Sequence, residues 1–271
     1  MMPKISRRKF IKRTILASIG LFLLDIFWFE KYLIKWKYFD ISATENNKIT
    51  IVQLSDLHLK KVNNTHKSIA EKINKLSPDV LCITGDAIDE NQNVEVLNSF
   101  LKLLDHNIKK YAITGNWEYW GKVDLVKMKA LYHSHNCQLL INESHQLSIK
   151  ERTLSIIGID DFVGGNANFK KAAKNISPSD LHIVLTHCPQ HRDNIKKEKG
   201  DLKIDLVLSG HTHGGQINIL GYAPFKPRGS GNYLSGWYNK TQPILYVSKG
   251  IGTSILPIRF GARAEVAIFE V

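Results

Sequence analysis

From residue 49 onward, short apolar runs of strand-like composition alternate with longer stretches whose apolar residues recur at helical spacing. The runs at 49–54, 80–84 and 111–114 contain many β-branched residues, and the stretches at 66–76 and 94–104 between them carry an apolar stripe. Parallel neighbouring strands need a crossover connection, which is usually a helix. The alternation therefore predicts an α/β fold whose first sheet is largely parallel.

The later part of the chain has a different pattern. Residues 139–149 and 154–159 are typical of a hairpin, and the sequence becomes rich in Gly and Pro after residue 214. Further strands are expected at 181–186, 204–208, 244–248 and 264–271. We therefore predict a second, mixed or antiparallel sheet. Because no composition shift interrupts residues 49–271, we expect one domain over residues 41–271.

Polar side chains that bind metals well follow five of the apolar runs. In α/β sheets the ligand site lies outside the carboxyl ends of the strands, so these side chains should converge at one edge. They supply oxygen and imidazole donors without a thiolate, which favours Mn, Fe or Zn in a non-structural site. The donors are Asp56, His58, Asp86, Asn116, His187, His211 and His213.

Seven donors are too many for one ion and suit two ions that share a carboxylate. Two cations about 3.5–4 Å apart clamp both the attacking and the leaving oxygen of an in-line displacement at phosphorus. They also lower the pKa of a bridging water, so that hydroxide is available at neutral pH to attack phosphorus. The sequence therefore predicts a dinuclear hydrolase of phosphoester or phosphoanhydride bonds.

The same residues form motifs that resemble the five ordered blocks of the calcineurin-like metallophosphoesterases. The resemblance covers residues 49–271 and implies a four-layer αββα sandwich. It implies that Asp56, His58 and His213 hold one metal ion, that Asn116, His187 and His211 hold the other, and that Asp86 bridges them. Of these, Asp86, Asn116 and His187 are also taken as catalytic. The blocks are Asp56-x-His58, Gly85-Asp86, Gly115-Asn116, His187 and Gly210-His211-Thr212-His213.

One block departs from the family pattern. Many members have His after Gly-Asn, where it helps to protonate the leaving oxygen, but this chain has Trp117, which supplies no proton at ordinary pH. General acid catalysis contributes about 10²–10⁴-fold. Glu118 is the candidate catalytic residue to replace it, unless a metal-bound water does so or the leaving group needs little help. Together with the family resemblance, this departure leads us to expect a phosphodiester or pyrophosphate bond, and a preference for pyrophosphates or activated diesters over alkyl phosphomonoesters.

Residues 1–40 differ from the rest and are predicted to be a separate N-terminal segment. They hold a net charge of +6, half of the +12 of the whole chain. Ser6-Arg7-Arg8-Lys9-Phe10-Ile11-Lys12 resembles a twin-arginine export signal ahead of the apolar run 14–29. That run is short for a membrane span. We interpret residues 14–39 as a retained membrane anchor or interfacial helix; the alternative is a helix packed on the domain.

This segment predicts a membrane-associated protein. The domain would lie on the periplasmic or extracytoplasmic face if the signal is used, and otherwise on the cytoplasmic face. The chain after Gln216 resembles a bacterial branch that includes phosphodiesterases and UDP-2,3-diacylglucosamine hydrolases, which act on a lipid A precursor. A lipid-linked phosphate substrate is therefore expected, with Arg228, Lys249 and Arg259 as candidate substrate-binding residues.

Two alternatives stay open. The first is a nuclease or nucleotide phosphodiesterase of the same fold, since the domain is basic. No basic patch with interleaved aromatic residues supports it, so no nucleic-acid partner is expected. The second is a non-catalytic scaffold on the same fold, but such a protein usually loses ligands, and all seven are present here.

Overall fold

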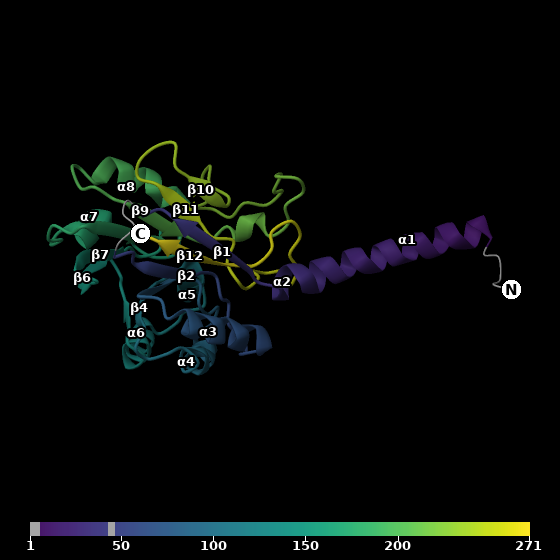
Figure 1. Cartoon of the computed structure of the whole chain (residues 1–271), viewed down its shortest axis with the longest axis horizontal. Coiled ribbons are helices and arrows are strands. Elements are labelled where there is room, and N and C mark those ends of the chain that lie inside the picture. Colours follow the sequence, from purple (N-terminus) through teal and green to yellow (C-terminus); the bar gives the residue numbers. More distant parts are fainter. Residues whose placement is uncertain (1–5, 43–46) are drawn as a thin grey trace.

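The computed structural model describes residues 6–42 and 47–271. Residues 1–5 of the predicted N-terminal segment and residues 43–46 of the predicted domain lie outside the described residues. The described chain forms two six-stranded β-sheets with helices outside them (Figure 1). This mixed α/β architecture confirms the predicted fold class.

The first sheet has the strand order β1–β12–β2–β3–β4–β5. Strands β2 to β5 are parallel, as the alternation with helices predicts, whereas β12 is antiparallel to β2 and parallel to β1. The bounds are β1 Lys35–Asp40, β2 Thr50–Leu54, β3 Val80–Thr84, β4 Lys109–Ile113, β5 Cys137–Leu139 and β12 Glu265–Glu270.

The second sheet has the order β10–β11–β9–β8–β7–β6. Its four inner strands are parallel, and the edge strands β6 and β10 are antiparallel to their neighbours. The predicted mixed sheet is therefore present. The bounds are β6 Glu143–Ile149, β7 Arg152–Gly158, β8 Leu181–Leu185, β9 Leu206–Ser209, β10 Gly236–Tyr238 and β11 Leu245–Val247.

Three hydrophobic clusters define the layers. One lies between the sheets and joins Ile51 and Phe269 of the first sheet to Ile156 and Ile183 of the second. A second cluster covers the outer face of the first sheet with α3, α4 and α6, and a third covers the second sheet with α7 and α8. The resulting order is helix, sheet, sheet, helix.

The helices of the domain are short, and α3, α6 and α7 begin at side-chain caps. The side chain of Asn63, for example, accepts a hydrogen bond from the amide of His66 at the start of α3. The bounds are α3 Asn64–Leu76, α4 Val94–Leu101, α5 Asn116–Trp120, α6 Leu125–Ser134, α7 Phe169–Ala173 and α8 Arg192–Glu198, with 3₁₀ turns at Asn91–Asn93, Pro189–His191 and His213–Gly215.

The N-terminal segment begins with helix α1 (Arg7–Leu24), which extends away from the body (Figure 1) and has no buried residue. It continues through a π-helical turn (Asp25–Phe29) into α2 (Glu30–Tyr32). Within the described part of the chain, no helix combines the length and apolar character needed to cross a bilayer. Residues 35–39, which we assigned to the anchor, instead belong to β1, because this segment pairs in parallel with β12; Phe39 then packs against Trp237 and Phe269.

Candidate metal centre

The predicted ligands come from loops at the carboxyl ends of strands in both sheets. Asp56 and His58 follow β2, Asp86 follows β3, and Asn116 is the first residue of α5 after β4. The second sheet contributes His187 after β8, and His211 and His213 after β9. All seven side chains are buried, and they meet where the two sheets present the same ends of their parallel strands.

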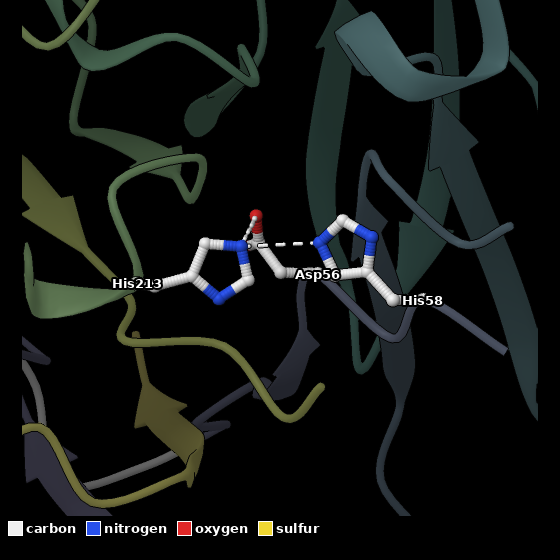
Figure 2. Close-up of side chains that lie close together, drawn as sticks. All are labelled: Asp56, His58 and His213. Carbon is white, nitrogen blue, oxygen red and sulfur yellow. Dashed lines mark hydrogen bonds and ion pairs between the residues drawn. The ribbon is translucent and has the colours of Figure 1, made fainter. Parts of the chain in front are cut away.

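The first cluster consists of Asp56, His58 and His213 (Figure 2). The Nε2 atoms of His58 and His213 lie 3.1 Å apart, and Nε2 of His213 lies 3.5 Å from Oδ1 of Asp56. Two imidazole nitrogens and a carboxylate oxygen that point at one another are a suitable donor set for a divalent ion.

The second cluster consists of Asp86, His187 and His211. Nε2 of His187 lies 3.1 Å from Oδ2 of Asp86 and 3.2 Å from Nδ1 of His211. The same Oδ2 atom of Asp86 lies 3.8 Å from Nε2 of His58 in the first cluster. Asp86 thus faces both clusters, which is the position a bridging carboxylate needs.

Asn116 provides an independent test of whether a metal fits here. Its Oδ1 atom is buried and has no hydrogen-bond partner among the described residues. An unsatisfied buried acceptor costs about 1–3 kcal/mol, so such atoms are rare unless a ligand or ion satisfies them. The donor chemistry of the site and this oxygen both fit a bound cation.

Three of the ligand histidines make a hydrogen bond through the ring nitrogen that points away from the metal clusters, and this bond sets the tautomer of each ring. Nδ1 of His187 lies 2.8 Å from the carbonyl oxygen of Thr84, and Nε2 of His211 lies 2.8 Å from that of Arg228. Nδ1 of His58 is bonded to the carboxylate of Asp89. Because the outward nitrogen of each ring donates its hydrogen, the inward nitrogen is the one that would bind a metal. Asp89 was missed in the sequence, where only its position three residues after Asp86 could have suggested it.

The backbone of the site is held in an uncommon conformation. Five of the seven ligands have a positive φ: Asp56, His58, Asp86, His211 and His213. Non-glycine residues in the left-handed region cost about 1–3 kcal/mol each and concentrate at functional sites. Close packing adds a second constraint, since a Cβ atom on Gly115 would lie 2.2 Å from Oδ1 of Asp86.

The carboxylates give the site a strong affinity for positive charge. Burial disfavours a charged His187, but the adjacent Asp86 carboxylate outweighs this effect and raises the pKa of the ring well above its usual value. The pKa of Asp86 is lowered to about 2 against the effect of burial, because His187 stabilises its charge. The pKa of His213 is shifted the other way. Burial lowers it most, and the nearby His58 and Arg259 lower it further, so this ring is neutral.

Glu118 lies beneath the site rather than in it. One carboxylate oxygen accepts hydrogen bonds from the amides of Ala87 and Ile88, and the other from those of Asp86 and Gly115. The side chain is fully buried. Both oxygens are therefore occupied in joining the loop after β3 to the start of α5, which is the geometry of a support for the ligands.

The three candidate substrate-binding residues occupy different places. Arg228 is exposed and lines the cavity beside the ligands. Arg259 is fully buried, bonds the carbonyl oxygens of Gly252 and Ala262, and lies 3.2 Å from Nδ1 of His213. Lys249 points to the carbonyl oxygen of Gly261 and is not among the residues that line the cavity.

A cavity of 430 Å³ opens beside the two clusters. Trp117, at the position of the missing His, lines it and packs edge-to-face on the ring of His58. The rest of the lining is largely apolar and includes Trp120, Ile217, Phe225, Pro227, Ile255 and Leu256, together with Arg228 and the polar side chains of Thr212, Gln216 and Ser254.

Two adjacent clusters that share a carboxylate, at the carboxyl ends of two facing sheets, define a dinuclear metallohydrolase site. In agreement, residues 49–215 match the calcineurin-like phosphoesterase family. The chain belongs to this family, whose members hydrolyse phosphoesters with two divalent metal ions.

Similar proteins include two uncharacterized metallophosphoesterases of Bacillus subtilis. YkuE is 30% identical over 288 residues, which cover 99% of this chain and 98% of YkuE. YkoQ is 30% identical over 234 residues, or 83% and 84% of the two chains. The solved structure of the sulfate thiohydrolase SoxB of Thermus thermophilus has a TM-score of 0.50 at 10% identity, covering 85% of this chain and 57% of SoxB. At that identity the likeness shows the fold alone.

Proposed function

We propose that this metallophosphoesterase hydrolyses a phosphodiester or pyrophosphate bond in a lipid-linked substrate at a membrane surface. The observation that carries the proposal is the asymmetry of the cavity. The cavity is lined by the ligands Asp86, Asn116, His211 and His213 and, beyond them, largely by aromatic and aliphatic side chains. A phosphate held at the ligands would leave an acyl chain against the apolar lining, where its apolar surface is removed from water.

The type of bond follows from what lines the cavity. Apart from the metal ligands, Arg228 is the one ionisable side chain among the described residues that line it. An arginine guanidinium can donate hydrogen bonds to phosphate oxygens, but it does not act as a proton donor to an alkoxide. A leaving group that is itself a phosphate or nucleotide needs no such proton, which favours a pyrophosphate or an activated diester.

Bound divalent ions would supply a hydroxide nucleophile and neutralise charge on the phosphate. The chain's own residues have separate tasks. Asp86 faces both clusters and would bridge two bound ions, and Asn116, whose buried Oδ1 has no hydrogen-bond partner among the described residues, would be a further ligand. Arg228 is exposed and lines the cavity, where it would orient the charged end of the substrate. We also propose that the two bound ions are Mn, Fe or Zn.

We propose a membrane-associated location, with the domain on the extracytoplasmic face if the twin-arginine-like signal is used and on the cytoplasmic face otherwise. Helix α1 supports this, because it has exposed apolar residues along its length and five cationic residues in its first two turns. Reporter domains fused to the carboxyl terminus would give the topology directly. An active cytoplasmic reporter together with an inactive exported reporter would exclude export.

The proposal that the substrate is lipid-linked is tested by comparing the hydrolysis of two substrates that differ only in their acyl chains. UDP-2,3-diacylglucosamine and the same nucleotide sugar without acyl chains present the same pyrophosphate. We expect kcat/KM at least about tenfold higher for the acylated compound, the gain that burying a few methylene groups gives. Phe225→Ser should reduce that advantage and leave the rate on the deacylated compound unchanged. Equal rates on both compounds in the wild-type protein would contradict the proposal.

The two alternatives have their own outcomes. Faster cleavage of a dinucleotide or single-stranded DNA than of any acylated substrate would favour a nucleotide phosphodiesterase. Fewer than one bound metal ion per chain, together with no hydrolysis in Mn²⁺, would favour a non-catalytic scaffold. Metal analysis of the purified full-length chain should instead find about two ions per chain.

A further inference from the structure

A tight turn near the metal centre exposes an apolar tip. Ile219 and Tyr222 pair across this turn through two backbone hydrogen bonds, which leaves Leu220 and Gly221 at its end. Leu220 is fully exposed and has a φ of 51°, so it occupies the left-handed region that favours Gly or Asn. Stability does not explain a leucine here, since it buries nothing and strains the backbone.

A second exposed apolar tip lies beside the first. Ile255 is 89% exposed and has a φ of 60°, which is an outlier for a β-branched residue. Gln216 ties the two loops together: its side-chain amide donates to the carbonyl oxygens of Ser254 and Leu256 and accepts from the amide of Ser254. These hydrogen bonds join the two loops that carry the tips.

Helix α1 emerges on the same side of the molecule. The ring of Phe22 packs against Phe260, whose amide bonds the carbonyl oxygen of Gln216. The amide of Arg259 bonds the carbonyl oxygen of Ile26 in the turn after α1. Figure 1 shows α1 leaving the body next to the green and yellow loops of the carboxyl-terminal part. We call these parts, residues 7–29, 217–228 and 253–258, the docking side.

The docking side is predominantly cationic. Its three ranges contain seven Lys or Arg and one acidic residue, Asp25. Five of the seven lie in helix α1, which has no acidic residue, and the other two are Lys226 and Arg228. Exposed apolar tips among cationic side chains match a surface that offers both anionic groups and hydrocarbon.

We infer that the docking side binds a bilayer that contains anionic lipids, with the 219–222 turn inserted into the headgroup layer. Ile255 and Phe225 line both this side and the cavity, so docking would bring the cavity mouth to the lipid surface. Two separate protruding tips suit insertion between lipids better than a flat contact with another folded protein. The inference rests on the membrane location proposed above, but not on the identity of the substrate.

Vesicle co-sedimentation of the full-length chain tests this inference. The vesicles are phosphatidylcholine alone or with roughly one third phosphatidylglycerol, a composition that adds anionic headgroups. The variant Leu220→Asn/Tyr222→Ser removes the apolar tip, and Asn tolerates the left-handed backbone. We expect about tenfold weaker binding to the anionic vesicles than wild type, because burial of one large apolar side chain contributes that much. Val126→Ser, at another strongly exposed apolar residue, on α6, is the matched control and should bind like wild type.

Hydrolysis of bis(p-nitrophenyl) phosphate in solution serves as a separate measurement. It should be unchanged in the variant, so a failure of the metal site and a failure of docking are distinguishable. Unchanged vesicle affinity in the variant would overturn the inference, as would equal binding of wild type to the two vesicle types. A concentration-dependent dimer in solution that the variant abolishes would also overturn it, since the side would then bind a second copy.

Insertion itself is measured with an environment-sensitive dye. The three native cysteines are buried, so Leu220→Cys offers an accessible thiol for an NBD label, and Val126→Cys provides the matched control. We expect a blue shift and increased emission at position 220 when anionic vesicles are added, with no change at position 126. If the emission of the label at position 220 did not change when anionic vesicles were added, the turn would still be in water and the inference would be overturned.

Discussion

Asp89 accepts a hydrogen bond from Nδ1 of His58, and both side chains are buried. Asp89 lies on the loop that also carries Asp86, whereas His58 belongs to the loop after β2. Asp89 therefore orients His58, a ligand of the first cluster, and it does so from the same loop that carries Asp86, the residue that faces both clusters. Nε2 of His58 is held with its lone pair toward His213 and Asp86 as a result.

Asp89→Ala should weaken metal binding about 10- to 100-fold, because partners in the outer shell have effects of this size on metal affinity. The dependence of hydrolysis rate on Mn²⁺ concentration and direct calorimetric titration both measure it. Asp89→Asn keeps an acceptor of the same shape and should recover part of the loss. Asp201→Ala, at an exposed aspartate, is the control and should leave the affinity unchanged.

Glu118→Gln tests whether Glu118 supports the ligand loops or supplies a proton. The amide group of Gln places hydrogens toward backbone amides that need acceptors, so we expect about 1–3 kcal/mol less stability and weaker metal binding. Urea denaturation and metal titration measure these effects. Wild-type stability and metal affinity, combined with a loss restricted to substrates with poor leaving groups, would instead identify Glu118 as the proton donor.

The regular parts of this fold and the order of its ligands could be predicted because they rest on local patterns. Buried parallel strands such as Val80–Thr84 are nearly continuous apolar runs, and the polar residue after each run marks the site edge. Strand β1 could not be predicted in this way. Its alternating lysines and aromatic residues also suit a membrane interface, and only the pairing with β12, some 230 residues away, makes it a strand.

The supporting contacts of the site were likewise beyond the sequence. The role of Asp89, the four amides around Glu118 and the burial of Arg259 all depend on which side chain faces which loop after folding. Arg259 was a reasonable phosphate-binding candidate by charge, but tertiary packing places it against Gly252 and Ala262. Residue type predicts the chemistry that a group can do, and the fold decides where that group points.

Gly115→Ala should abolish metal-dependent hydrolysis. The added Cβ atom would lie 2.2 Å from Oδ1 of Asp86 and 2.5 Å from its amide nitrogen, so the loop that carries the bridging carboxylate must move. A misplacement of about 1 Å costs on the order of 100-fold in rate. Gly20→Ala in α1 is the control, because nothing lies within 4 Å of the added atom there. Full activity of Gly115→Ala would show that the loop can move without loss of the bridge.

His191 should make the stability of the fold depend on pH. Burial lowers its pKa from 6.5 to about 4, so between these values the unfolded chain binds a proton that the folded chain does not. The free energy of unfolding is therefore not reduced by His191 above pH 6.5. It falls as the pH drops from 6.5 toward 4, by about 3 kcal/mol in total. Urea denaturation in EDTA at pH 7.5 and 4.5 measures the difference. In His191→Gln the difference between the two pH values should be smaller by about that amount; an identical pH dependence would contradict the assignment.

Trp117→His should restore the proton donor that the family pattern carries at this position. Trp117 lines the cavity beside the ligands and packs on His58, so an imidazole there would reach a leaving oxygen. Because a general acid helps poor leaving groups most, the rate on alkyl phosphate diesters should rise about 10- to 100-fold relative to that on p-nitrophenyl diesters. The slope of log kcat/KM against leaving-group pKa measures the change across a substrate series. Trp120→His places the same ring further along the cavity wall and should leave the slope unchanged. An equal slope in Trp117→His and wild type would mean that the wild-type protein already protonates its leaving group by another route, and the preference for pyrophosphates would then lose its physical basis.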